Sequence, residues 1–131
     1  MDERAIIIFK AISYGELCSG DSGDVWCDFC SCDDTYNPYS LGIHDADCPV
    51  TLARILLSEL GIPLLLYRVE YEYPSFFDDW RPHTNYRLAF SEQEIRELYQ
   101  ENLEPERKHY HPKRRNIQVT MIGEAQKILK K

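Results

Sequence analysis

Cysteine and histidine side chains in the first half of the chain are the residues best suited to chemistry. Cys27 and Cys30 form a C-x-x-C pair, and His44 and Cys48 form an H-x-x-x-C pair thirteen residues later. A two-residue spacer points both sulfurs at one place, and residues four apart can converge at the entrance to a helix. Three thiolates and an imidazole make a closed tetrahedral set for a structural Zn²⁺ ion. We therefore predict one zinc ion per chain, held by Cys27, Cys30, His44 and Cys48.

The remaining two of the five cysteines leave alternatives open. Cys32 can replace Cys30 as a ligand because C-x-C pairs also chelate, although a two-residue spacer closes the turn with less strain. A redox C-x-x-C needs a strand before it and a helix at the pair, whereas a glycine-rich segment precedes Cys27. We expect Cys18 to be a small core residue. The odd count and the lack of a secretory signal argue against a disulfide framework.

Two helices are expected to position these ligands. Residues 2–14 predict a helix with an apolar face of Ala5, Ile8, Phe9 and Ile12, although a buried strand over 6–9 competes. Asp2 can cap this helix and Gly15 can end it, and a loop is expected over 15–26.

The second helix begins at Pro49, because the missing N–H of proline costs nothing at the first helical position. Its apolar face is predicted from Leu52, Ile55, Leu56 and Leu60. Cys48 then lies at the helix N-terminus, where the helix dipole favours a thiolate.

The second half of the chain predicts a different unit. Tyrosine and valine alternate with charged residues over 67–73, which indicates a half-buried strand. A long irregular loop is expected over 74–84, and a short strand over 86–90. A capping box opens a helix at Ser91, with Ile95, Leu98 and Tyr99 on its apolar face. Alternation over 117–121 predicts a third strand, and 125–129 a last short helix.

These elements predict an α+β fold. It comprises an N-terminal helix, a Cys3His zinc module leading into a helix, and a small β-sheet with one or two packed helices. We expect two parts, a helix and zinc-finger module over 1–62 and an α+β module over 63–131 with the order ββαβα, packed as one compact unit.

Charge is distributed unevenly along the chain. The net charge is −7, yet residues 105–131 hold eight Lys and Arg against two acidic residues. A nucleic-acid arm is one interpretation of this end, with contacts from Arg107, Lys108, Tyr110, Lys113, Arg114 and Arg115. The simpler interpretation is a solvated basic element that folds back on an acidic body, since the overall field repels phosphate.

An aromatic loop in the second half is the best candidate for contact with a protein. Phe76, Phe77 and Trp80 are bulky side chains bordered by carboxylates, as at an interface anchor with a polar rim; the alternative is that they fill the core. Asp78, Asp79 and His83 could form a hydrolytic site, but adjacent carboxylates are usually solvated. The sequence has no phosphate-binding glycine loop and no nucleophile elbow, so we expect no enzyme and no small-molecule substrate.

Residues 27–57 resemble a motif of small bacteriophage and bacterial zinc-finger proteins of unknown function. That motif has a C-x-F/Y-C knuckle followed by H-x-x-D-C-P-V-x-x-A-R-x-L-L, which His44 to Leu57 match here. The resemblance implies zinc on Cys27, Cys30, His44 and Cys48, and it carries no reaction and no defined partner. The sequence therefore favours a zinc-stabilised acidic binding protein, plausibly phage-encoded, that docks on a host or viral protein. We expect it in the cytoplasm, with no membrane association. The alternative is a nucleic-acid-binding regulator that uses the finger and segment 106–115.

Overall fold

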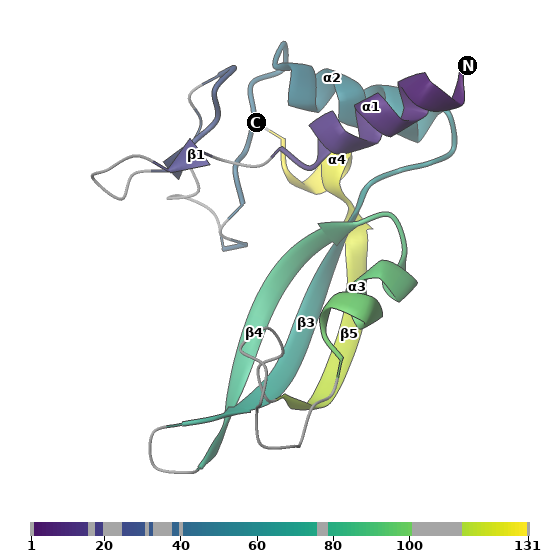
Figure 1. Cartoon of the computed structure of the whole chain (residues 1–131). Helices are drawn as coiled ribbons and strands as arrows, with labels where there is room; N and C mark the ends of the chain where they lie inside the picture. Colours follow the sequence, from purple (N-terminus) through teal and green to yellow (C-terminus); the bar gives the residue numbers. More distant parts are fainter. Residues whose placement is uncertain are drawn as a thin grey trace.

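The chain folds as an α+β protein, as its sequence predicts, with a group of helices at one end of a three-stranded sheet (Figure 1). The computed structural model describes residues 2–15, 18–19, 25–30, 32, 38–39, 41–75, 79–100 and 114–130. Its elements are α1 (Glu3–Ser13), β1 (Cys18–Ser19), β2 (Val25–Trp26), α2 (Pro49–Glu59), β3 (Leu65–Pro74), β4 (Trp80–Ala89), α3 (Glu92–Leu98), β5 (Arg115–Glu124) and α4 (Ala125–Ile128). Among these residues, no helix is long and apolar enough to cross a membrane.

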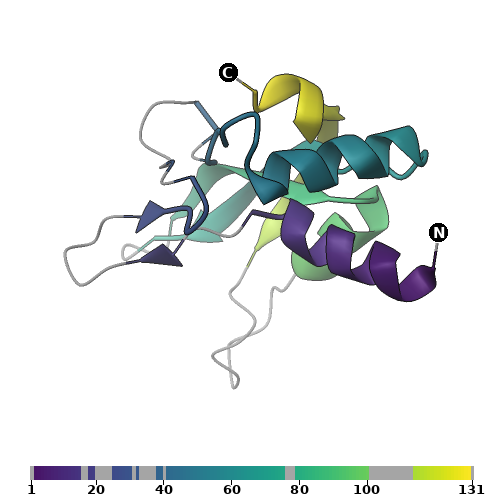
Figure 2. The ribbon, with the colours of Figure 1, turned by 90° about the horizontal axis from the view of Figure 1, so that it is seen from above.

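Helices α1 and α2 pack side by side, as the view from above shows (Figure 2). The predicted caps of α1 are confirmed, because the carboxylate of Asp2 accepts the N–H of Arg4 at 2.8 Å and Gly15 follows the helix with a φ of +61°. Only glycine adopts that backbone conformation without strain. Pro49 opens α2 as expected, directly after Cys48.

The predicted apolar face of α2 is wrong at two of its four positions. Leu52 and Leu60 are 53% and 41% exposed, whereas Ile55 and Leu56 are half-buried. The buried residues of this helix are instead Val50, Ala53, Arg54 and Leu57. These positions also follow the i, i+3, i+4, i+7 spacing of a helix face, but that face includes an arginine and was therefore not recognised. On α1, Ile8 was likewise expected inside and is 57% exposed.

Two segments expected to be loops contain strand. β1 and β2 form a short antiparallel pair within 15–26, with Cys18 opposite Trp26. β4 begins at Trp80 rather than at residue 86, and it includes Pro82. Proline is tolerated there because β4 lies at the edge of the sheet, where an N–H can face away from the neighbouring strand.

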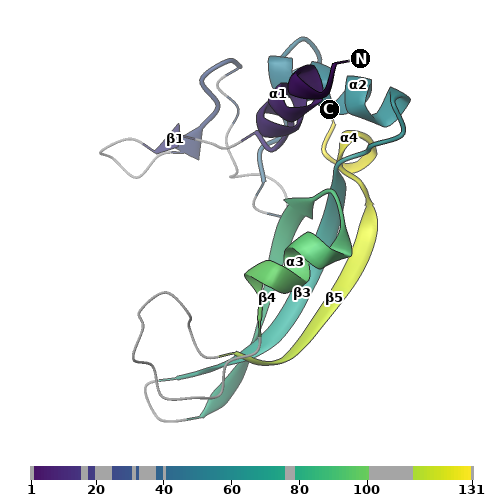
Figure 3. The ribbon, with the colours of Figure 1, turned by 45° about the vertical axis from the view of Figure 1, so that its right-hand side comes forward.

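The main sheet is antiparallel with β3 in the centre, flanked by β4 and β5. Helix α3 covers part of one face (Figure 3). Beneath it, Tyr67, Val69 and Ala89 of the strands pack with Ile95 and Tyr99. The predicted cap of α3 at Ser91 is confirmed, because Ser91 Oγ accepts the N–H of Glu94. The Glu94 carboxylate accepts the N–H of Phe90, one residue before the position that a capping box uses. Leu98, predicted on the apolar face of α3, is 60% exposed.

A second hydrophobic cluster joins the helical end to the sheet. Leu64, Ala125 and Leu129 are its buried members, and Tyr14 and Phe90 pack against them with their rings edge to face. The N–H of Ala125 donates to Leu64 O at 2.9 Å, which fixes α4 to the segment that leads from α2 into β3. The helices that position the Cys/His cluster are thereby tied to the start of the central strand.

Candidate metal centre

Five potential metal ligands converge between the turn at residues 27–32 and the start of α2. One ligand atom from each of Cys27, Cys30, Cys32 and His44 lies within 4.8 Å of the other three. The sulfur of Cys48 joins this group, at 3.9 Å from the sulfur of Cys27. A group of three cysteines and one histidine could hold a metal ion at this place, and the structure offers one thiol more than that set requires.

His44 faces the thiols through its Nδ1 atom. That nitrogen lies 3.6 Å from the sulfur of Cys30, 3.4 Å from that of Cys32 and 3.6 Å from that of Cys48. The side chain is 2% exposed, as are Cys27 and Cys48, whereas Cys30 and Cys32 are partly exposed. The cluster therefore has a buried side at the helices and a more open side at the turn.

Backbone hydrogen bonds shape the turn that carries three of the cysteines. The N–H of Cys27 donates to Cys32 O at 2.8 Å, which brings the two ends of the turn together. The N–H of Phe29 donates to the sulfur of Cys27 at 3.4 Å. This hydrogen bond holds the sulfur of Cys27 against the backbone of the turn.

A second turn, fixed by Asp45, presents His44 and Cys48 together. The carbonyl of Asp45 accepts the N–H of Cys48 at 3.1 Å and the hydroxyl of Thr51 at 2.7 Å. Cys48 is the N-cap residue of α2. Its sulfur therefore lies at the positive end of the helix dipole, which favours the thiolate form that binds metal.

Arg54 and Gly15 close the buried side of the cluster. Arg54 is 3% exposed, and its Nε donates to Ser13 O at 2.7 Å at the end of α1. A Cβ at Gly15 would lie 2.8 Å from His44 Nε2 and 3.1 Å from Arg54 Nη2. Any other residue at this position would push these groups apart. His44 Nε2 itself is buried without a hydrogen-bond partner among the described residues.

Burial dominates the ionisation of these groups. It raises the pKa of Cys32 to about 12 and that of Cys48 to about 11, with neighbouring thiols adding to both increases. Burial also raises the pKa of Cys30, but the backbone amides of Asp45 and Cys32 outweigh it and lower the pKa overall. A bound metal must therefore displace protons from thiols, which makes its affinity depend on pH.

The two basic groups of the site respond differently. Burial, followed by the nearby charge of Arg54, lowers the pKa of His44 to about 4, so the imidazole is a neutral ligand at pH 7. Burial lowers the pKa of Arg54 to about 10, while thiolates at Cys32, Cys48 and Cys27 oppose this change. Arg54 therefore remains a cation at neutral pH, next to a cluster that carries negative charge once its thiols ionise.

The structure brings the four predicted ligands together, and it adds Cys32. The choice among the four thiols stays a prediction. Sequence reasoning missed Arg54 as a support of the cluster. The spacing of Val50, Ala53, Arg54 and Leu57 could have indicated this role, because these residues share one face of a helix. That face is recognised only if a charged residue is accepted among the buried ones.

Other residues singled out in the sequence lie far from this cluster or outside the described part. Trp80 is half-buried, with the Arg115 guanidinium 4.3 Å from the centre of its ring. Arg114 stacks on Tyr71 and Tyr99, so the two described arginines of the basic segment lie against the sheet. Asp79 and His83 of the hydrolytic candidate are described and exposed. The following members of the predicted sites lie outside the described residues: Phe76, Phe77, Asp78, Arg107, Lys108, Tyr110, Lys113 and the Cys18 side chain.

In comparisons with known proteins, no family model, no curated protein and no solved structure matches this chain.

Proposed function

We propose that the Cys/His cluster binds one structural Zn²⁺ ion. Zinc bond lengths of about 2.3 Å to sulfur and 2.0 Å to nitrogen imply tetrahedral edges of about 3.8 Å between sulfurs and about 3.5 Å between sulfur and nitrogen. The Cys27–Cys48 separation is 3.9 Å, and His44 Nδ1 lies 3.6 Å from both Cys30 and Cys48. These distances are the observation that carries the proposal.

The donor set supports a structural rather than a catalytic ion. A catalytic zinc keeps one position for water beside three protein ligands. Here five donors surround one point, which is enough to fill all four positions with protein atoms. We therefore infer that the ion stabilises the turn and the start of α2, and that the protein works by binding rather than by catalysis.

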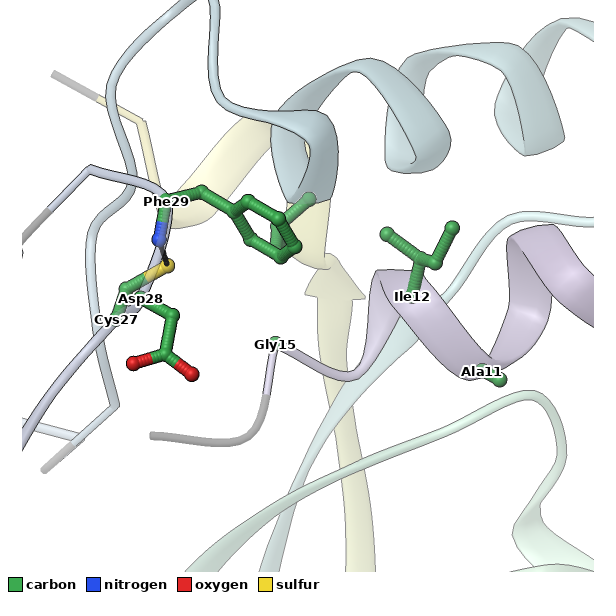
Figure 4. Close-up of a pocket in the computed structure, with 7 residues that line it drawn as sticks. Ala11, Ile12, Gly15, Cys27, Asp28 and Phe29 are labelled. Atoms are coloured by element: carbon green, nitrogen blue, oxygen red, sulfur yellow. Dashed lines mark hydrogen bonds between the residues drawn. The ribbon is translucent and has the colours of Figure 1, made fainter. Parts of the chain in front are cut away.

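A protein is the partner class that we propose. Phe29 follows the first two residues of the metal turn and is 67% exposed. Its ring points toward Ile12 of α1 across a cavity of about 210 Å³ that Gly15 and Val50 also line (Figure 4). Ile8 lies one turn further along α1 and is also exposed. Exposed apolar side chains grouped in this way favour contact with another protein, for which Trp80 stays a second candidate anchor.

The resemblance of residues 27–57 to phage zinc-finger proteins leads us to propose a host or viral protein as that partner. A binding role without catalysis is consistent with the closed donor set. Cytoplasmic location belongs to the same proposal.

Metal analysis tests the zinc proposal directly. Protein expressed in zinc-supplemented medium, with its thiols reduced, is expected to contain about one zinc per chain. Absence of metal from such folded protein would refute it.

Partner capture tests the surface. Tagged wild-type protein and a Phe29→Ala variant are compared in lysate of the source cell, with Leu98→Ala as the matched control because Leu98 is similarly exposed but belongs to α3. We expect a protein retained by the wild type and the control but lost with Phe29→Ala. Equal capture by all three proteins would show that Phe29 is not part of the interface.

A further inference from the structure

The arginines on the two faces of the main sheet differ in whether they have ion-pair partners. Directly opposite residues of paired strands share a face. On the face away from α3, arginines are matched by carboxylates: Arg68 lies 2.9 Å from Glu70, and Arg115 lies 3.4 Å from Glu72. This face therefore has balanced charge in spite of its exposed position.

The face on the side of α3 has cations without such partners. β4 places Arg81, His83, Asn85 and Arg87 opposite residues 73, 71, 69 and 67 of β3. Arg81, His83 and Arg87 are exposed, and Arg114 joins them over the rings of Tyr71 and Tyr99. None of the three arginines is in an ion pair with a carboxylate in the described part of the chain. We call the set Tyr71, Tyr73, Arg81, His83, Asn85, Arg87 and Arg114 the tyrosine–arginine face.

The acidic side chains of α3 make contacts with residues other than these arginines. Helix α3 lies on the same side of the sheet, and its Glu92 pairs with Arg96. Glu94 accepts the N–H of Phe90, and Glu97 accepts the side-chain amide of Gln93. The sequence of residues 101–113 holds three acidic and three basic side chains, so it adds no net charge. Among the described residues, the three arginines of this face therefore have no ion-pair partner, in a chain whose total charge is −7.

Aromatic rings lie among these cations. The ring of His83 meets those of Tyr71 and Tyr73 edge to face, at 5.4 and 5.6 Å between centres. Asn85 fixes the arrangement, because its amide donates to the hydroxyls of Tyr71 and Tyr99, and its oxygen lies 3.1 Å from His83 Nε2. Arg87 also donates to the Tyr99 hydroxyl, at 2.8 Å. These rings, Arg87 and Arg114 are thus held in place before any ligand arrives.

We propose that the tyrosine–arginine face binds single-stranded nucleic acid. Exposed arginines contact the phosphates, and Tyr73 and His83 offer ring surfaces for unpaired bases, which is the combination that single strands require. This activity goes beyond the proposed zinc and protein-binding function, and it uses the sheet rather than the metal centre. Salt screens the acidic groups elsewhere in the chain beyond about 8 Å at physiological ionic strength. Contact of a nucleic-acid strand with this face therefore depends mainly on the charges of the face itself.

The salt dependence of binding follows from the number of cations. Three arginines contacting phosphate give a slope of about −2 in a plot of log affinity against log salt for a single strand. Replacing two of them is expected to reduce the size of the slope by about 1.4. Loss of a stacking ring lowers affinity by about fivefold or more without changing the slope.

The experiment measures fluorescence anisotropy of labelled oligonucleotides with zinc-loaded protein at three salt concentrations. The probes are a twelve-residue uridine RNA, a twelve-residue thymidine DNA, a duplex DNA and polyglutamate. Arg81→Gln with Arg87→Gln is the main variant, Tyr73→Ala tests stacking, and Arg68→Gln is the control on the opposite face. Because Arg87 also contacts Tyr99, the single Arg81→Gln variant keeps the test valid if the double variant unfolds: Arg81 makes no hydrogen bond or ion pair with another described residue.

We expect micromolar binding of a single strand, a loss of tenfold or more in the double variant, and no change with Arg68→Gln. Stronger binding of RNA or of DNA identifies which strand the face prefers. The proposal is overturned if wild-type protein binds neither single strand, if duplex or polyglutamate binds equally well, or if Arg68→Gln weakens binding as much as Arg81→Gln.

Discussion

Cys30 and Cys32 are expected to substitute for one another as metal ligands. Both sulfurs lie close to His44 Nδ1, at 3.6 and 3.4 Å, and both belong to the same turn. The Cys27 and Cys48 thiols and the His44 imidazole are buried, so no other thiol can take the same position on the buried side of the site. Serine variants of each cysteine therefore separate fixed ligands from interchangeable ones.

The size of the effect follows from the donor count. Structural zinc contributes about 10–16 kcal/mol of apparent binding free energy, or about 2.5–4 kcal/mol for each of four ligands. Cys27→Ser or Cys48→Ser also leaves three thiols beside His44, but it removes a buried ligand whose position no other thiol can take, so each should weaken zinc binding by about 100- to 1,000-fold. Cys30→Ser or Cys32→Ser should weaken it by less than about tenfold, because the remaining thiol keeps three thiolates around the ion. The single net negative charge of that set still matches the cation of Arg54.

Zinc affinity is measured by competition with a chromophoric chelator at pH 7 under reducing conditions. The double variant Cys30→Ser with Cys32→Ser is the control, and it should lose as much affinity as Cys27→Ser. The reasoning is refuted if either single variant at position 30 or 32 is as damaging as Cys27→Ser, or if the double variant binds zinc as well as the single ones.

Three further outcomes are expected. Arg54→Met should weaken zinc binding by about 10- to 100-fold, as loss of an outer-shell partner does. Arg54→Lys keeps the positive charge and should retain most of the zinc affinity. Equal losses of affinity in the same chelator assay would show that the hydrogen bonds of Arg54 to α1 matter and its charge does not. The free energy of unfolding of the metal-free protein should fall as pH decreases from about 6.5 toward 4, by at most about 1.4 kcal/mol per pH unit. The reason is that His44 is protonated in the unfolded chain over this range but stays neutral in the folded protein. Urea unfolding of wild type and His44→Asn across this range measures the effect, and equal pH dependence in both would contradict it. Ser91→Ala should lower the free energy of unfolding by about 1 kcal/mol through loss of the cap on Glu94, and an unchanged thermal midpoint would argue against that cap.

Local chemistry determined much of the fold from the sequence. Asp2, Pro49 and Ser91 mark helix starts because their side chains or rings suit the first turn of any helix, whatever surrounds it. Alternation over 67–73 indicated β3 because successive side chains of a strand always point to opposite faces. The candidate metal ligands could be recognised for the same reason, since thiol and imidazole spacing is a property of a short segment.

Tertiary contacts decided what local patterns could not. The rotation of α2 depends on Cys48 and Arg54, which attach the helix to the cluster and to α1, and these contacts leave Leu52 exposed. The approach of Cys32 depends on a turn closed by Cys27. The charge difference between the two sheet faces depends on the register of β3 with β4 and β5. Each brings together residues distant in the sequence, and a hydrophobic or charge pattern along one segment carries no information about which distant segment will lie beside it.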